Sequence, residues 1–305
     1  MTASDVFIQQ VINGLTIGMI YALIALGYTL VYGIIQLINF AHGEVFMVGA
    51  YLSLLIFTLF TGIFAGIGGS VLFLVLTFLF AMLGTSVMGL VIERFAYRPL
   101  HAAPRLAPLI TAIGISFLLQ NAVMLIFGPT DKRFPDLIPI HQFSFGAVTF
   151  TNLQILIAAV SVSLMVSLQI FIKTTRTGKA MRALADDREA ASLVGIDTNR
   201  IISIAFVIGS ALAGAGGVMF GMYYHTINFH DGYLAGLKAF TAAVFGGIGN
   251  VPGAMLGGLL LGILEGVGAG YLSSEWKNVF AFLILILILL FRPSGLLGSR
   301  VVKKV

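Results

Sequence analysis

The sequence predicts an all-α polytopic membrane protein, and three observations support this fold class. Of the 305 residues, 59% are hydrophobic and only 10% are charged, against about half and a quarter in an ordinary soluble domain. Long apolar runs recur along the chain, and each approaches the roughly 20 residues that a bilayer-spanning helix needs. Most Lys and Arg residues fall in three polar segments between or after these runs. This composition excludes a secreted enzyme, a disordered chain and a nucleic-acid-binding domain, in spite of the net charge of +5.

Eight apolar runs predict eight full transmembrane helices within a single transmembrane domain, 1–305. They cover residues 11–35, 45–63, 70–92, 106–128, 152–172, 200–221, 253–272 and 277–291. A ninth segment, 233–249, is apolar but short, rich in Gly and interrupted by Lys238. We expect it to form a short or broken helix that is buried against protein.

The basic residues predict the orientation of the helices. Thirteen of the seventeen lie in three segments: Arg94, Arg98 and Arg105; Lys173, Arg176, Lys179, Arg182, Arg188 and Arg200; and Arg292, Arg300, Lys303 and Lys304. Because Lys and Arg are enriched in cytoplasmic loops, we expect all three segments to face the cytoplasm. The amino terminus is then periplasmic, the carboxyl terminus is cytoplasmic, and 233–249 has to cross the membrane.

The inner loop 173–199 predicts an amphipathic helix over 180–194. One face carries Lys179, Arg182, Asp186 and Glu189, and another carries Ala183, Leu184, Ala190, Ala191 and Val194, interrupted by Asp187. We expect Gly195 to end this helix in a left-handed conformation, and Asp197 or Thr198 to cap the next span.

Two roles are open to this loop helix. It can lie along lipid headgroups or fit a groove on a cytosolic partner. The acidic residues, a single Leu and the lack of an aromatic side chain on its apolar face favour the partner.

The loop also carries a family resemblance. Glu189-Ala190-Ala191, with Gly195 four positions later, resembles the EAA motif of permease subunits in ATP-binding-cassette importers, the loop helix that docks on the ATPase. The general motif continues with Ile-x-Leu-Pro, whereas this sequence has Ile204-Ala205-Phe206-Val207. That departure points to the hydrophobic amino acid uptake permeases, which lack the proline ending.

Other segments resemble the same family over essentially the whole chain. They are Asn13-Gly14, Tyr21-Ala22-Leu23, Gly27-Tyr28-Thr29, Ile38 to Glu44, Glu93-Arg94, Tyr97-Arg98-Pro99, and the run Gly236 to Val244 followed by Gly246-Gly247-Ile248-Gly249 and Pro252-Gly253-Ala254. The resemblance is to LivH-type permeases of high-affinity branched-chain amino acid importers.

The resemblance implies a multi-pass subunit of the bacterial inner membrane that translocates leucine, isoleucine, valine or related amino acids without catalysing bond chemistry. Its implied partners are a second, LivM-like permease, two cytosolic ATPases and a periplasmic binding protein. ATP and Mg²⁺ would bind the ATPases, and we expect no cofactor on this chain. The implied ATPase-coupling residues are Arg182, Asp186, Glu189, Ala190, Ala191 and Gly195.

Few polar residues lie at membrane depth, where an ionisable side chain costs about 2.5–3.5 kcal/mol on insertion scales. Candidates for the translocation path are Asn39, His42, Glu44, Lys238 and Glu265. For Lys238 we favour snorkelling to an interface, and Glu265 requires a partner. The turn 36–44 can instead be an interfacial turn whose side chains satisfy the freed backbone.

Glycines at four-residue spacing mark the span 253–272. Gly258, Gly262, Gly266 and Gly270 remove side chains from one face, so another helix can approach closely. We favour tight packing within this subunit over a gate. No metal site is predicted, because the five His residues lack ligand spacing and Cys is absent.

Two other function classes stay open on the residues alone. A secondary transporter or channel would work without ATPases, but ion-coupled carriers usually need several buried carboxylates, and only Glu265 is placed with certainty at depth. An intramembrane enzyme is disfavoured because no span contains Asp and the chain has no Cys.

Overall fold

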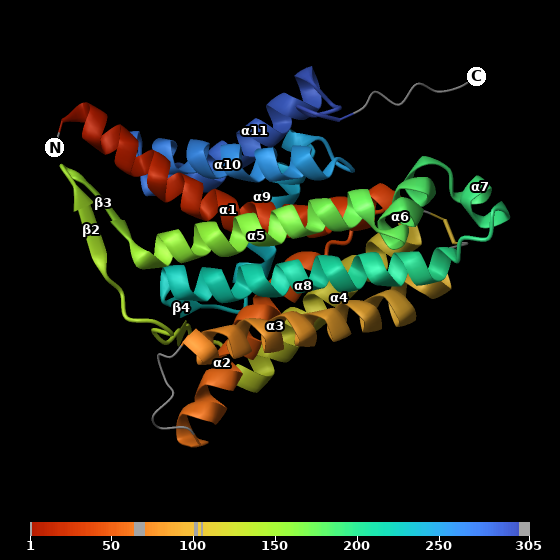
Figure 1. The fold of residues 1–305 in the computed structure, drawn as a ribbon, viewed down its shortest axis with the longest axis horizontal. Coiled ribbons are helices and arrows are strands. Elements are labelled where there is room, and N and C mark those ends of the chain that lie inside the picture. The colour runs from red at the N-terminus through yellow and green to blue at the C-terminus, as the bar shows by residue number, and fades with distance from the viewer. Residues whose placement is uncertain (1, 64–70, 101–102, 105, 299–305) are drawn as a thin grey trace.

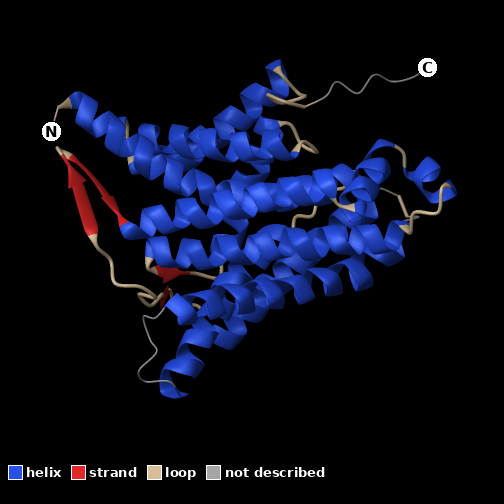
Figure 2. Ribbon diagram, in the orientation of Figure 1, coloured by secondary structure: helices blue, strands red, loops and turns tan. Residues whose placement is uncertain are grey.

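The chain folds into a bundle of long helices in a computed structural model, which describes residues 2–63, 71–100, 103–104 and 106–298. The helices are α1 (Ala3–Ile35), α2 (His42–Ile63), α3 (Val71–Ile92), α4 (Leu106–Phe127), α5 (Asn152–Thr174), α6 (Arg176–Asp186), α7 (Arg188–Leu193), α8 (Thr198–Tyr224), α9 (Asp231–Gly246), α10 (Val251–Tyr271) and α11 (Lys277–Phe291). Three short helical turns are η1 (Glu93–Tyr97), η2 (Arg98–Leu100) and η3 (Ser274–Trp276). Figure 2 shows that the few strands gather near one end of the bundle.

Seven of the described helices are long and apolar enough to cross a membrane: α1, α2, α3, α4, α5, α8 and α10. The eighth predicted span is α11, which has only 15 residues. The short ninth segment is α9, with 16 residues. The predicted class, an all-α polytopic membrane protein, is confirmed, with seven helices of spanning length and α11 shorter than the full span expected over 277–291.

The bundle has two distinct ends (Figure 1). One carries α6, α7 and the end of α11, and we call it the α6–α7 end; the other carries the start of α1 and the strands β2 (Gln142–Phe145) and β3 (Val148–Thr151), and we call it the hairpin end. The described basic residues of the three predicted segments lie at the α6–α7 end. Arg105, Arg300, Lys303 and Lys304, which belong to the same prediction, lie outside the described residues.

Helix α1 lies at the centre of the bundle and is buried on all sides between Thr16 and Val31. Its apolar residues show no preferred face, as expected of a helix surrounded by others. It packs against α8, α9 and most extensively α10. The helix begins at Ala3, where Thr2 and Asp5 form a reciprocal capping box.

Two short antiparallel sheets at the hairpin end join segments of the loops. β2 and β3 pair antiparallel, with Phe143 opposite Phe150. β1 (Lys132–Arg133) pairs with β4 (Thr226–Ile227), which follows α8. Gln9 of α1 donates to the carbonyl oxygen of Thr149 at 2.9 Å and accepts from its amide at 2.8 Å. The outer loop is therefore fixed to the first helix.

Candidate functional site

The inner loop forms two helices where the sequence predicted one over 180–194. Helix α6 ends at Asp186, and Asp187 adopts an extended conformation with φ −151° and ψ 112° before α7 begins. The Asp187 carboxylate accepts the backbone amides of Glu189 at 2.9 Å and Ala190 at 3.0 Å. The single-helix prediction is wrong because Asp187 caps a new helix instead of continuing the old one.

Helix α6 is held against the end of α5. Thr175 caps it by accepting the Gly178 amide at 3.0 Å. A Cβ atom on Gly178 would lie 2.5 Å from the Cα of Ile172, so only glycine allows this approach. The Arg182 guanidinium donates to the Ile172 carbonyl oxygen. Arg182 thus caps the last turn of α5 and positions α6. The sequence pattern had instead placed this residue on the charged face of the loop helix.

Helix α7 ends in a Schellman motif. The amides of Gly195 and Ile196 donate to the carbonyl oxygens of Ser192 and Ala191, both at 3.1 Å. Gly195 has φ +85°, so its predicted left-handed conformation is confirmed. The Asp197 carboxylate accepts the Arg200 amide at 3.0 Å, which confirms its predicted capping of α8.

The turn after α7 exposes an apolar tip, Leu193 and Val194, with 87% and 78% of their surface accessible. Ala191 faces inward and is 3% exposed. Asp186, Glu189 and Ala190 are exposed beside the tip. The predicted apolar face is therefore divided: Ala191 fixes α7 to the protein, whereas Val194, together with its neighbour Leu193, remains uncovered at an end of the molecule.

A buried ion pair joins α9 and α10. The Lys238 ammonium lies 2.8 Å from Glu265 Oε1, and the two side chains are 9% and 2% exposed. The ammonium also lies 5.7 Å from the centroid of the Tyr21 ring on α1, within range of a cation–π interaction. The snorkelling interpretation of Lys238 is wrong, because this lysine is the partner that Glu265 requires.

The turn between α1 and α2 buries its polar residues. Asn39, His42 and Glu44 are 3%, 2% and 1% exposed. Asn39 Oδ1 accepts the Ala41 amide at 3.1 Å and the Tyr97 hydroxyl at 3.2 Å. The turn thus satisfies its own backbone and contacts η1 at the end of α3.

Glu44 extends from the start of α2 toward two other helices. Its Oε1 accepts the Ser116 hydroxyl of α4 at 3.1 Å. A Cβ atom on Gly232 of α9 would collide with Oε2. Of the five candidate path residues, Glu44 contacts Ser116, a half-exposed residue of α4, and Lys238 and Glu265 contact each other. The structure does not bring the five into one site.

The four spaced glycines of α10 face α1. A Cβ atom on Gly266 would lie 2.7 Å from the Gln10 carbonyl oxygen, and one on Gly18 would lie 2.9 Å from that of Gly258. Cβ atoms on Gly262 and Gly270 would collide with Gly18 and with Gln10. These glycines therefore form a close helix contact inside the subunit.

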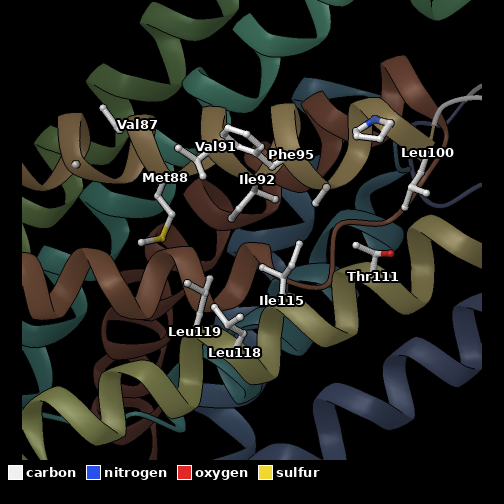
Figure 3. Close-up of a pocket in the computed structure, with 13 residues that line it drawn as sticks. Val87, Met88, Val91, Ile92, Phe95, Leu100, Thr111, Ile115, Leu118 and Leu119 are labelled. Atoms are coloured by element: carbon white, nitrogen blue, oxygen red, sulfur yellow. The ribbon is translucent and has the colours of Figure 1, made fainter.

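An apolar groove of about 620 Å³ lies between α3, η1 and α4. Figure 3 shows side chains of α3, including Met88 and Ile92, opposite Ile115 and Leu119 of α4. Thr111 supplies the only side-chain hydroxyl of its lining. A groove this apolar lacks partners for the charged amino and carboxyl groups of a free amino acid.

Comparison with known proteins decides the family. The model of the family described as "branched-chain amino acid transport system / permease component" matches residues 10–289. The chain belongs to this permease family. It is therefore a translocation component of a multi-subunit transport system and a multi-pass protein of the inner membrane.

Relatives match over nearly the full length. The permease protein BraD of the high-affinity branched-chain amino acid transport system of Pseudomonas aeruginosa is 50% identical, with 98% of each chain covered. The corresponding permease LivH of Escherichia coli K12 is 48% identical with the same coverage. A probable branched-chain permease of Methanocaldococcus jannaschii is 28% identical over 90% of this chain and 88% of its own. No solved structure matches.

Three features of this permease were missed from the sequence. Leu193 stood outside the predicted apolar face, although it directly precedes Val194 at the end of the motif. The second is Thr175, the N-cap of α6. It follows the apolar run 152–172 and Lys173, and threonine is a common N-cap residue. The Lys238–Glu265 pair had a compositional signal: Lys238 is the only charged residue of the segment 233–249, and Glu265 is the only one of 253–272.

Proposed function

We propose that this chain is the membrane permease subunit of an ATP-driven importer of branched-chain amino acids or related hydrophobic amino acids. The observation that carries the proposal is the identity of 50% and 48%, over 98% of the chain, to two permeases of high-affinity branched-chain amino acid transport systems. The subunit provides the membrane path and performs no bond chemistry.

Its proposed partners are a second, LivM-like permease, two cytosolic ATPases and a periplasmic binding protein. ATP and Mg²⁺ bind the ATPases, and no cofactor is assigned to this chain. In this arrangement the α6–α7 end is cytoplasmic and the hairpin end is periplasmic, which agrees with the excess of Lys and Arg at the α6–α7 end.

The α6–α7 element is the proposed contact with an ATPase. Leu193 and Val194 form an exposed apolar tip that fits a hydrophobic pocket, and Asp186 and Glu189 lie on its charged rim. Closure of the ATPase dimer moves α7, and the movement reaches the spans through two connections. Arg182 ties α6 to α5, and the short segment 194–197, in which Asp197 caps α8, joins α7 to α8.

Co-purification tests the coupling. The tagged chain, co-expressed with the ATPases and second permease of its own operon, should retain both ATPases. Leu193→Asp and Val194→Asp should each remove most of the bound ATPase, and Glu189→Lys should weaken it. Phe145→Asp is the matched control, since Phe145 is 85% exposed at the opposite end. If the tip variants retained the ATPases as fully as Phe145→Asp, the coupling role would be rejected.

Uptake tests the transport class. Proteoliposomes containing the complete system should accumulate labelled leucine only with ATP and binding protein, and the tip variants should not. An ATPase-independent secondary transporter would accumulate leucine on an ion gradient with this chain alone. Against that alternative, Glu265 is already neutralised by Lys238. Uptake without ATPase would nevertheless overturn the proposal.

A further inference from the structure

A polar cleft lies between α3 and α8 at the α6–α7 end, apart from the α6–α7 element and from the buried ion pair. It has a volume of about 520 Å³, within the range of about 300–1,000 Å³ for small-molecule sites. The two helices run side by side (Figure 1) and contact each other extensively. The Arg98 guanidinium crosses to Ser203 at 2.8 Å, and below it Ser86 donates to the Val207 carbonyl oxygen at 3.2 Å. The cleft is therefore a fixed feature of the helix pair.

The cleft has an excess of positive charge. Arg94, Arg98 and Arg200 line it, and Asp197 is the one carboxylate in its lining. Arg98 is neutralised by Glu93, which is fully buried and accepts two hydrogen bonds from the Arg98 guanidinium at 3.0 and 2.9 Å. The guanidinium groups of Arg94 and Arg200 have no hydrogen-bond or ion-pair partner among the described residues. Their charges are available to an anion.

The lining is graded from polar to apolar along the helices. Leu90 of α3 lies four residues before Arg94 of η1, and Ile204 and Val207 follow Arg200 by one and two turns of α8. The basic side chains therefore lie at the helix ends, and the apolar ones lie deeper in the membrane. A free phosphate would use only the basic part of such a cleft.

We propose that this cleft binds an anionic phospholipid, with its phosphate between Arg94 and Arg200 and an acyl chain along Leu90, Ile204 and Val207. Basic pockets between transmembrane helices at the membrane surface bind the head groups of anionic lipids. Arg98 forms the inner wall of the site, because its fork is already engaged by Glu93. The lipid fills the α3–α8 cleft and stabilises the contact between these helices.

Lipid binding to the purified transport complex tests the site. Native mass spectrometry measures the binding of phosphatidylglycerol and of phosphatidylcholine. The native complex should prefer phosphatidylglycerol, and Arg94→Gln/Arg200→Gln should weaken its binding by about 30-fold. The matched control is Lys173→Gln/Lys179→Gln, which removes two exposed charges at the same end that do not line the cleft.

Three other outcomes would each reject the proposed phospholipid site. Equal losses in the two double variants would mean that phosphatidylglycerol follows only the general positive charge of this end. Displacement of the lipid by millimolar inorganic phosphate would mean that the apolar lining contributes nothing and a phosphate ion is the ligand. Loss of the ATPases from Arg94→Gln/Arg200→Gln with unchanged lipid binding would identify the cleft as a protein contact.

Discussion

The buried ion pair of Lys238 and Glu265 gives the sharpest test of the packing between α9 and α10. The ammonium and the carboxylate are 2.8 Å apart, and the side chains are 9% and 2% exposed. Removal of one partner from a buried pair costs about 3–5 kcal/mol, whereas replacing both by apolar residues of similar size is often close to neutral. We expect Lys238→Met and Glu265→Leu each to lower the free energy of unfolding by about 3–5 kcal/mol. The double variant should recover most of this loss.

The assay is unfolding in mixed micelles by titration with SDS. Trp276, the only Trp of the chain, lies in η3 between α10 and α11 and reports the transition by fluorescence. Lys173→Met is the matched control, because Lys173 is exposed at the end of α5. It should change the unfolding free energy by no more than ~0.5 kcal/mol.

Two results would refute the reasoning about this pair. Single variants that lose less than about 1 kcal/mol would behave like an exposed ion pair, contrary to the burial of both side chains. A double variant no more stable than the worse single variant would mean that each residue acts through other contacts, so that the measured coupling between Lys238 and Glu265 would be zero.

Three further predictions concern backbone geometry. Gly195→Ala should lower ATP-dependent leucine uptake, since a left-handed conformation costs a residue with a Cβ about 1–2 kcal/mol. Gly195→Asn should lower uptake less, because Asn adopts this conformation more readily. Equal losses of uptake in the two variants would contradict the backbone explanation. Asp187→Ala should speed amide exchange in residues 188–193 by roughly fivefold through loss of the cap, and Asp187→Asn should not; identical exchange in both would exclude a capping role. Gly262→Leu should destabilise the protein to SDS by about 1–3 kcal/mol because it overpacks the contact with α1. Gly114→Leu, with no neighbour within 4 Å, should be tolerated, and similar midpoints would contradict the close approach.

Continuous apolar segments were predictable because a helix that crosses a bilayer needs both about 20 residues and a predominantly apolar composition. The segment expected over 106–128 is α4, Leu106–Phe127. Helix α1 was expected from residue 11, yet it begins at Ala3. Gln9 and Gln10 lower the local hydropathy, so the apolar run in the sequence starts after them. In the folded protein Gln9 binds Thr149 of the hairpin, a contact 140 residues away in sequence.

Local backbone chemistry at the candidate site was also predictable, within limits. Gly195 and Asp197 form hydrogen bonds with residues only three positions away, so their residue types were sufficient to predict the end of α7 and the cap of α8. Asp187 was ambiguous because it can lie on a continuous helix or cap a new one. The outcome depends on α6 being anchored to α5 by Gly178 and Arg182. That anchoring is tertiary and has no signal in helical periodicity.

The placement of small residues suggests how a movement at α7 could reach the membrane path. Helix α8 starts three residues after Gly195 and contacts α1, α2 and α3. Its contacts with α1 and α2 include backbone atoms: a Cβ atom on Gly209 would lie 3.2 Å from Gly27 Cα, and one on Gly49 would lie 2.7 Å from Gly214 Cα. Contacts of this kind have few interlocking side chains, so small displacements along them disturb little packing. The Glu93–Arg98–Ser203 network, in contrast, fixes the start of α8 to the end of α3. Under the proposed coupling, a displacement of α7 would move α3 and α8 together past α1 and α2, and the proposed lipid cleft between α3 and α8 would travel with them unchanged.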